Sequence, residues 1–176
     1  MALVAAPMTL LTAAGLELEP LSVAHADAMF EVLADPELYR YMDNAPPPSV
    51  EHLRGLYERQ VVGKSPDGSE TWLNWVIRRP GHPPMGYVQA TVSSAHQAWV
   101  AYVLGRRHWG EGHAHAAMDA MLKHLSAARG VVRFLATVEV DNLRSIRLLE
   151  RLGFRLADAR EAGGHHLTET ERLYIR

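Results

Sequence analysis

The sequence predicts a single mixed α/β domain in which a central, mostly antiparallel sheet carries helices on both faces. Short segments of alternating apolar and polar residues, separated by turn residues, indicate half-buried strands. Apolar residues at helical spacing dominate two later segments, and one further strand lies between them. A run of antiparallel strands followed by a strand–helix–strand–helix unit is typical of a mixed sheet covered on both sides.

In the first third of the chain, one strand and three helical segments are expected. Residues 16–19 (LELE) alternate as a strand does. Ser22 and Ser49 can each cap a helix, and Asp35-Pro36-Glu37 begins a short helical segment with proline at its first position. The apolar residues that define the two longer helices are Ala26, Met29, Phe30 and Leu33, and then Leu53, Leu56, Tyr57 and Val61.

A three-stranded meander follows. Turns at residues 66–68, 80–84 and 93–97 separate the strands expected over residues 72–78, 85–92 and 99–104. Trp72, Trp75 and Trp99 are expected as core or wall aromatics.

The last third alternates helix and strand. A helix is expected from Ala114 to about residue 128, where Gly130 ends it. Residues 131–140 are expected as a strand, and Asp141 or Asn142 begins a helix that Gly153 ends, with Phe154 packing behind it. A closing hairpin is expected from residues 155–159 and 171–175, around a loop at residues 163–166.

Length and composition limit the function classes. The 176 residues fit one domain, and residues 1–10 are expected as a frayed lead-in, because no basic segment marks a signal peptide and Pro7 interrupts the apolar residues. With 48% hydrophobic residues, 22% charged residues and a net charge of −2, the chain predicts a cytoplasmic globule with no nucleic-acid or membrane partner. The absence of cysteine excludes disulfides, thiolate catalysis and cysteine zinc sites.

Residues 109–114 (WGEGHA), here called the glycine loop, stand between a predicted strand and a predicted helix. Their two glycines allow a tight turn, and the helix start offers unpaired N–H groups and the positive end of its dipole. This arrangement indicates a diphosphate site. A P-loop would need a lysine and a hydroxyl where His113 and Ala114 stand, and a dinucleotide fingerprint would need a third glycine near the N-terminus.

The glycine loop and residues 142–154 (NLRSIRLLERLGF) together resemble the GNAT superfamily of acyl-CoA-dependent N-acyltransferases, and within it the ribosomal-protein N-terminal acetyltransferase (RimJ/RimL-type) branch. The family pattern Gln/Arg-x-x-Gly-x-Gly/Ala is matched by Trp109-x-x-Gly112-x-Ala114, and tryptophan at its first position is common in that branch. A weaker match covers residues 11–18 and 35–37, so the resemblance spans almost the whole chain.

The resemblance implies an acetyl-CoA-dependent N-acetyltransferase that moves the acyl group to a primary amine in a ternary complex. It implies that the strand at 99–104 splays from the strand at 131–140, that backbone groups there pair with the pantetheine arm, and that the Leu104 N–H polarises the thioester carbonyl. No metal is expected. The implied acyl-CoA-binding residues are Tyr102, Val103, Leu104, Trp109, Gly110, Glu111, Gly112, His113, Ala114, Asn142 and Ser145.

Acyl transfer also needs an acid and a base. Leu149 stands where many members of the superfamily carry a tyrosine acid, and Ser145 matches the serine that the ribosomal branch is thought to use. Glu139 is a candidate base, or it faces solvent; Arg106 and Arg107 either attract the ligand phosphates or are solvated. His108, His113 and His115 do not form a metal site, since His113 and His115 point in different directions on a helix.

The acceptor stays open at this stage. It is either a protein N-terminus or a small amine such as an aminoglycoside or a polyamine, and a non-catalytic acyl-CoA-binding or regulatory domain is the alternative function. Candidate acceptor residues are Tyr39, Tyr41 and Tyr87, in a region given a mild acidic bias by Glu31, Asp35, Glu37, Asp43 and Glu51. The chain is expected to be a monomer or a homodimer.

Overall fold

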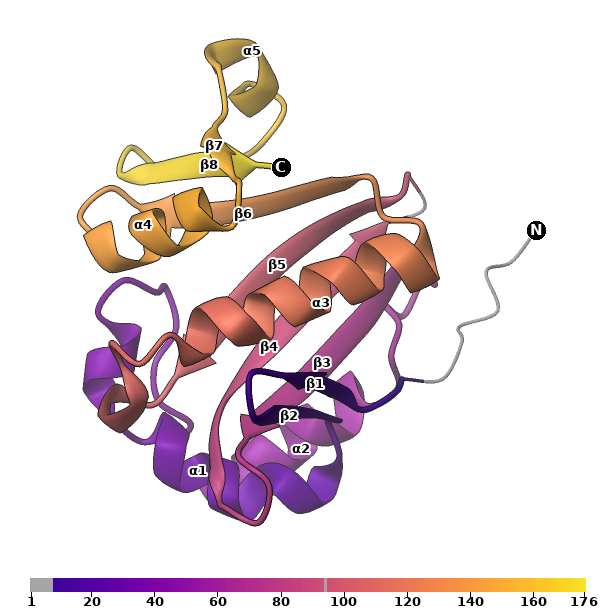
Figure 1. Ribbon diagram of the computed structural model, residues 1–176, viewed down its shortest axis with the longest axis vertical. Coiled ribbons are helices and arrows are strands. Elements are labelled where there is room, and N and C mark those ends of the chain that lie inside the picture. The colour runs from indigo at the N-terminus through magenta and orange to yellow at the C-terminus, as the bar shows by residue number, and fades with distance from the viewer. Residues whose placement is uncertain (1–7, 94) are drawn as a thin grey trace.

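The computed structural model describes residues 8–93 and 95–176, and within them one sheet runs in the order β1-β2-β3-β4-β5-β6-β8-β7 (Figure 1). Every neighbouring pair is antiparallel except β5 and β6, which are parallel, so the predicted mixed, mostly antiparallel sheet is confirmed. The strands are β1 (Leu11–Ala13), β2 (Leu16–Pro20), β3 (Glu70–Arg78), β4 (Pro84–Ser93), β5 (Gln97–Leu104), β6 (Arg133–Glu139), β7 (Arg155–Leu156) and β8 (Glu171–Ile175).

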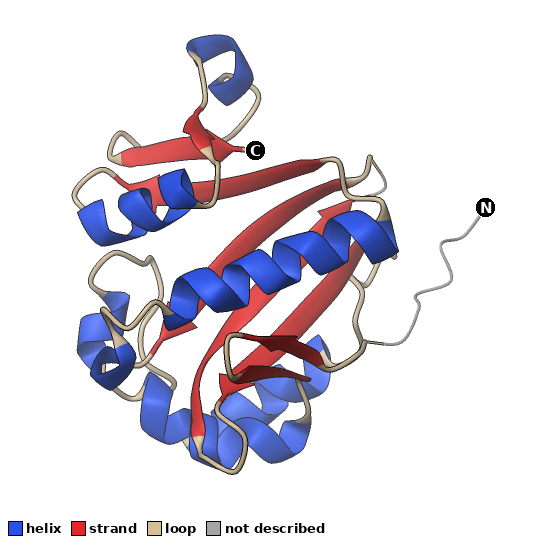
Figure 2. Ribbon diagram, in the orientation of Figure 1, coloured by secondary structure: helices blue, strands red, loops and turns tan. Residues whose placement is uncertain are grey.

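Helices cover both faces of this sheet, as expected (Figure 2). Trp75 and Val76 are consecutive on β3 and therefore face opposite sides; Trp75 packs in the apolar cluster of α3 and α4, and Val76 in that of α1 and α2. The helices are α1 (Ala26–Leu33), α2 (Val50–Gln60), α3 (His113–Arg129), α4 (Leu143–Arg151) and α5 (Ala159–Ala162), with short 3-10 segments η1 (Val23–His25), η2 (Pro36–Tyr39) and η3 (Arg106–His108). In the described part of the chain, no helix has both the length and the apolar character needed to cross a membrane.

The predicted helix starts are confirmed at three caps. The Asp35 carboxylate accepts from the Glu37 N–H at 3.1 Å, and the Ser49 hydroxyl accepts from the His52 N–H at 3.1 Å. At α4, Asn142 is the capping residue, which decides between the two expected starts.

The first strand and the lead-in differ from expectation. Strand β1 precedes β2 and pairs with it through a turn in which Ala14 (φ 48°) and Gly15 (φ 78°) are both left-handed, the requirement of a type I′ hairpin. Residues 1–7 of the predicted lead-in and Ser94 of the predicted 93–97 turn lie outside the described residues. Residues 8 and 9 are docked, because Met8 packs against the core and the Thr9 carbonyl accepts from the Trp75 indole N–H at 2.9 Å.

The closing hairpin is shorter than predicted. Strand β7 ends at Leu156 because the Asp158 carboxylate caps α5, accepting from the N–H groups of Arg160 and Glu161. Strand β8 then enters between β7 and β6 and pairs antiparallel with both.

The parallel pair opens after three residues. Gln97, Ala98 and Trp99 of β5 pair with Arg133, Phe134 and Leu135 of β6, and beyond this point the two strands no longer pair, while β6 continues to pair with β8 along its other edge. The remainder of β5, from Val100 to Leu104, therefore has a sheet edge that no strand covers within the described residues. This splay is the one implied by the sequence resemblance.

Candidate functional site

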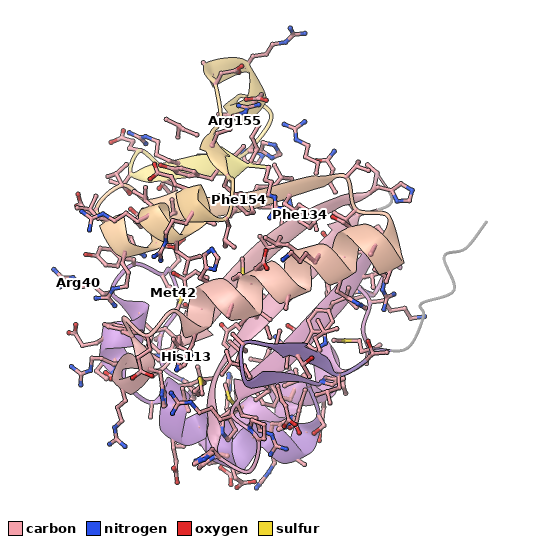
Figure 3. The ribbon with its side chains drawn as sticks, viewed as in Figure 1. Arg40, Met42, His113, Phe134, Phe154 and Arg155 are labelled. Carbon is pink, nitrogen blue, oxygen red and sulfur yellow. The ribbon has the colours of Figure 1, made fainter. Side chains whose placement is uncertain are left out.

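A cavity of about 570 Å³, here called the cleft, lies where β5 separates from β6. Its walls come from η2 and the segment after it (Glu37, Leu38 and residues 40–42), the end of β5, the last residue of η3, the glycine loop, the start of α3, and α4 with the two residues before it. Arg40 and Met42 belong to the first of these, and in Figure 3 they lie beside the gap between α4 and the first turn of α3, near His113.

The open edge of β5 presents backbone hydrogen-bonding groups to the cleft. The Gly105 N–H donates to the Met85 carbonyl of β4 at 2.7 Å, and backbone direction alternates along a strand. Gly105 and Val103 thus turn their backbone groups toward β4, whereas Tyr102 and Leu104 turn theirs outward. Of the three residues expected to pair with a bound arm, two offer backbone groups at the open edge, and Val103 contributes its side chain to the wall.

The glycine loop passes directly into α3. Gly110 and Gly112 have φ of 82° and 80°, and Gly112 is the residue that caps the 17-residue helix. A Cβ built on either glycine meets no atom within 4 Å, so their empty side faces open space rather than packed protein. The unpaired N–H groups of the first turn of α3 are therefore accessible to an anion.

Side chains on the outer side of the glycine loop hold it to the β3–β4 connection. Arg79 Nη2 lies 3.0 Å from a carboxylate oxygen of Glu111, and the same oxygen lies 2.8 Å from His113 Nε2. The carboxylate of Glu111 thus restrains the loop from outside, and Glu111 is absent from the lining of the cleft, whereas Gly110, Gly112, His113 and Ala114 contribute to that lining.

Trp109 joins the glycine loop to both walls of the cleft. Its indole N–H donates to the Leu104 carbonyl at 2.7 Å, and the guanidinium carbon of Arg144, from α4, lies 3.9 Å from its ring centroid. The tryptophan at the first position of the motif therefore works as a structural link between β5, the loop and α4.

We expect Trp109→Phe to weaken CoA binding about 3- to 10-fold, because phenylalanine keeps a ring beneath Arg144 but loses one hydrogen bond, worth roughly 0.5–1.5 kcal/mol. Calorimetric titration with CoA measures this change. Trp72→Phe is the matched control, since its indole donates to Glu70 outside the cleft. Equal CoA affinity in the Trp109 and Trp72 variants would contradict the role given to Trp109.

The start of α4 forms the opposite wall. The Asn142 side-chain oxygen accepts from the Ser145 N–H at 3.2 Å, and the Tyr102 hydroxyl donates to the Ser145 hydroxyl oxygen at 3.4 Å. All three residues line the cleft. Burial raises the pKa of Tyr102, against smaller opposing effects of Ser145 and nearby arginines, so its phenol keeps its proton at neutral pH.

Some predicted residues are not brought into the cleft. Glu139 ends β6 opposite Glu171 of β8, and neither Arg106 nor Arg107 lines the cavity; Arg106 pairs with Asp35 at 3.1 Å. A role for Glu139 as a base, or for Arg106 and Arg107 as phosphate-binding residues, therefore stays a prediction, because none of the three is part of the cleft lining.

Two arginines of α4, and not Arg106 or Arg107, bring positive charge to the cleft. Arg144 and Arg151 line the cleft, and their spacing of seven residues puts them on one helix face. That periodicity was the signal in the sequence that could have identified them.

An imidazole also faces the cleft. Burial lowers the pKa of His108, so this ring is mostly neutral at neutral pH and can accept a proton. Among residues 8–93 and 95–176, no group of three or more His, Cys, Asp or Glu side chains is arranged to hold a metal ion.

The three candidate acceptor tyrosines do not line the same cavity. Tyr41 lines the cleft, while Tyr39 and Tyr87 line a second cavity on the α1 and α2 side of the sheet.

Comparison with known proteins gives consistent matches. A family model described as an acetyltransferase (GNAT) domain matches residues 15–155. The Uncharacterized N-acetyltransferase p20 of Bacillus licheniformis is 26% identical over 142 residues, covering 80% of this chain and 79% of that protein.

Two solved structures are similar over nearly the whole chain. RimL, a ribosomal L7/L12 alpha-N-protein acetyltransferase in complex with coenzyme A, has a TM-score of 0.79 at 20% identity, covering 96% of this chain and 97% of that chain. Mycobacterium smegmatis RimJ in complex with a CoA-disulfide has a TM-score of 0.77 at 20% identity, covering 96% of this chain and 85% of that chain. At this level of identity, the likeness shows a shared fold.

Proposed function

Because the chain belongs to the GNAT acetyltransferase family, we propose that it transfers the acetyl group of acetyl-CoA to a primary amine by direct transfer in a ternary complex. The observation that carries the proposal is the cleft itself. One wall is an open strand edge, one end is the N-terminus of α3 capped by a left-handed glycine, and the other wall holds a hydroxyl.

The residues of the cleft fit acyl-CoA. The first turn of α3 and Gly110 to Gly112 suit its pyrophosphate, with Arg144 and Arg151 supplying positive charge. The outward backbone groups of Tyr102 suit an amide of the pantetheine arm, as an added strand suits a sheet edge, whereas the Leu104 carbonyl already accepts from the Trp109 indole.

Transfer forms a C–N bond and breaks the C–S bond. The neutral amine attacks the thioester carbonyl carbon, and the Leu104 N–H, directed at the open edge, stabilises the negative charge that develops on oxygen. The amine nitrogen gives up a proton, which His108 or water can accept, and the departing sulfur gains one, which the Ser145 hydroxyl is placed to donate. Tyr102 donates toward Ser145 and so orients that hydroxyl.

The similarity to RimL and RimJ favours the RimJ/RimL-type branch and makes a peptide N-terminus one acceptor class to test. Acyl transfer by the residues of the cleft requires only a primary amine.

Release of free CoA thiol from acetyl-CoA over a panel of amines and short peptides tests the proposal. We expect thiol release only when an amine is present, with N-acetylated product in equal amount by mass spectrometry. CoA binding without turnover on any amine would favour the alternative, a non-catalytic CoA-binding domain.

We expect Tyr102→Phe to lower kcat about 2- to 10-fold with little change in the dissociation constant for CoA, because one weak hydrogen bond to Ser145 is lost. The effect should vanish in a Ser145→Ala background, as a double-mutant cycle of coupled residues requires. Tyr174→Phe, a buried tyrosine on β8 outside the cleft, is the control. Additive losses in the double variant would contradict the coupling.

A further inference from the structure

A second cavity of about 230 Å³, here called the tyrosine pocket, lies on the opposite face of the sheet from α3 and α4. It is enclosed by α2, by residues 44–48 before that helix, and by side chains of β3 and β4. Three tyrosines, at positions 39, 57 and 87, contribute to its lining. Pro46, Pro47 and Pro48 hold one wall extended, because each proline ring fixes its own backbone.

The tyrosine pocket and the cleft are neighbours, because residues that line one pack against residues that line the other. Met42 and Val103 line the cleft and also pack in the same apolar cluster as Tyr57 and Tyr87. Val103 lies directly opposite Tyr87 in the β4–β5 ladder, a separation of about 5 Å between Cα atoms. Met42 is unbranched and adapts its shape readily, so a ligand can extend past it from one cavity toward the other.

Two tyrosine hydroxyls of the tyrosine pocket have no hydrogen-bond partner among the described residues. They belong to Tyr57 and Tyr87, and neither oxygen is among the fully buried polar atoms, so water or a ligand can reach both. The third phenol, Tyr39, donates to the Leu33 carbonyl at 3.0 Å and is thus satisfied. Burial raises the pKa of Tyr87 to about 12 and raises that of Tyr57, so both hydroxyls remain neutral donors. A ligand in the tyrosine pocket can supply the hydrogen-bond partner that each hydroxyl lacks within the described residues.

Charge and size limit what the tyrosine pocket can hold. Among the described residues that line it there is no Asp, Glu, Lys or Arg, and a second ammonium of a polyamine or an aminoglycoside would be desolvated there without a counter-ion. An apolar cavity of about 150 Å³ accommodates a benzene molecule, so 230 Å³ accommodates one ring with a short chain and excludes a multi-ring sugar.

We propose that the tyrosine pocket binds the body of the acceptor, a compact, uncharged, single-ring group with a polar tip, while the attached primary amine extends past Met42 into the cleft. This inference rests on the proposed function, because it assigns the acceptor side of the same reaction. The ring belongs either to the first side chain of a peptide or to a small arylalkylamine, and both present the same chemistry to the pocket.

The test measures acetyl-CoA turnover with tyramine, 2-phenylethylamine, spermidine and kanamycin, and with tetrapeptides that begin with Tyr or Glu. We expect kcat/KM for tyramine to exceed that for spermidine and kanamycin at least tenfold. The two tetrapeptides distinguish a peptide N-terminus from a small amine as the source of the ring, because only a peptide-accepting site turns over the Tyr peptide as well as tyramine.

Two variants connect this preference to the tyrosine pocket. Tyr57→Phe should lower kcat/KM for tyramine about 3- to 10-fold and leave that for 2-phenylethylamine within about twofold, since only the former has a hydroxyl to bind. Ala45→Trp, at an exposed lining position, should raise KM for both amines without changing CoA affinity. Ala127→Trp, exposed on α3 and outside both cavities, is the matched control.

Calorimetric binding of tyramine to the CoA complex separates failure of this inference from failure of the proposed function. If Ala45→Trp abolishes tyramine binding but no amine causes thiol release, the proposed ligand site in the tyrosine pocket is supported and the proposed acetyl transfer is contradicted. Turnover that is faster with spermidine or kanamycin than with tyramine, or that neither variant changes, would contradict the proposed ligand site in the tyrosine pocket and support the proposed acetyl transfer. If tyramine neither binds nor is turned over, and no other amine is turned over, both the proposed ligand site and the proposed acetyl transfer are contradicted.

Discussion

Gly112→Val is expected to abolish measurable CoA binding, with a dissociation constant at least about 100-fold higher than that of the unaltered chain. Gly112 has a φ of 80°, which an L-residue adopts only at a cost of about 1–2 kcal/mol, and more for a β-branched one. Relief of this strain would reorient the first N–H groups of α3. Loss of two hydrogen bonds to a charged phosphate, each worth roughly 1.5–3 kcal/mol, accounts for the expected change. Calorimetry with CoA measures it.

Gly130 offers a matched control for this experiment, because it caps the other end of α3 with a φ of 63°. Gly130→Val should lower the melting temperature much as Gly112→Val does, and it should leave CoA affinity unchanged. If either valine variant fails to fold, the Gly112→Ala and Gly130→Ala pair carries the same comparison with less strain. CoA binding by the Gly112 variant as strong as that of the Gly130 variant would refute the phosphate site at the glycine loop.

Ser145→Ala is expected to lower kcat about 10- to 100-fold while the dissociation constant for CoA changes little. One donor to the developing thiolate is worth roughly 1–3 kcal/mol, and each 1.36 kcal/mol is a factor of ten in rate. The capping bond at α4 should survive, since Asn142 accepts from the backbone N–H of Ser145 and not from its hydroxyl. Single-turnover measurement of acetyl transfer isolates the chemical step.

The conservative variant Ser145→Thr should restore most of the rate, because it keeps a hydroxyl at the same position. Ser126→Ala, at an exposed position on α3, controls for the loss of a helical serine elsewhere. An unchanged kcat in Ser145→Ala would remove this residue from the mechanism and leave water as the proton source.

Local sequence signals located most elements, because they depend on neighbouring residues alone. Alternation identified β3, β4 and β5, helical spacing identified α3, and Asn142 and Gly153 bounded α4. Hairpin β1–β2 was missed because its turn holds Ala14 in a left-handed conformation, where Asn or Gly would have been the recognisable signal. The length of β7 was overestimated because the Asp158 cap competes with continued pairing in the same five residues.

Within the cleft, the loop and helix residues were predictable and the charged residues were not. A glycine in a turn motif indicates a left-handed backbone by its residue type alone, and Gly112 adopts that conformation. The partner of an arginine depends on which elements meet: Arg106 is drawn to Asp35, while Arg144 reaches Trp109 from a helix that follows it by more than thirty positions in the chain.

Residue type and spacing were enough to predict the glycine loop, the helix start at Asp141 or Asn142 and, through their resemblance, the family, because each is a short-range pattern. The fold class followed from the order of the predicted strands and helices. Only the three-dimensional arrangement shows that β5 and β6 separate after Trp99, that Tyr102 reaches Ser145, and that three tyrosines line a pocket without Asp, Glu, Lys or Arg on the α1 and α2 side of the sheet. These features arise from contacts between segments far apart in the chain. Such contacts depend on which faces pack together, and no local pattern specifies that.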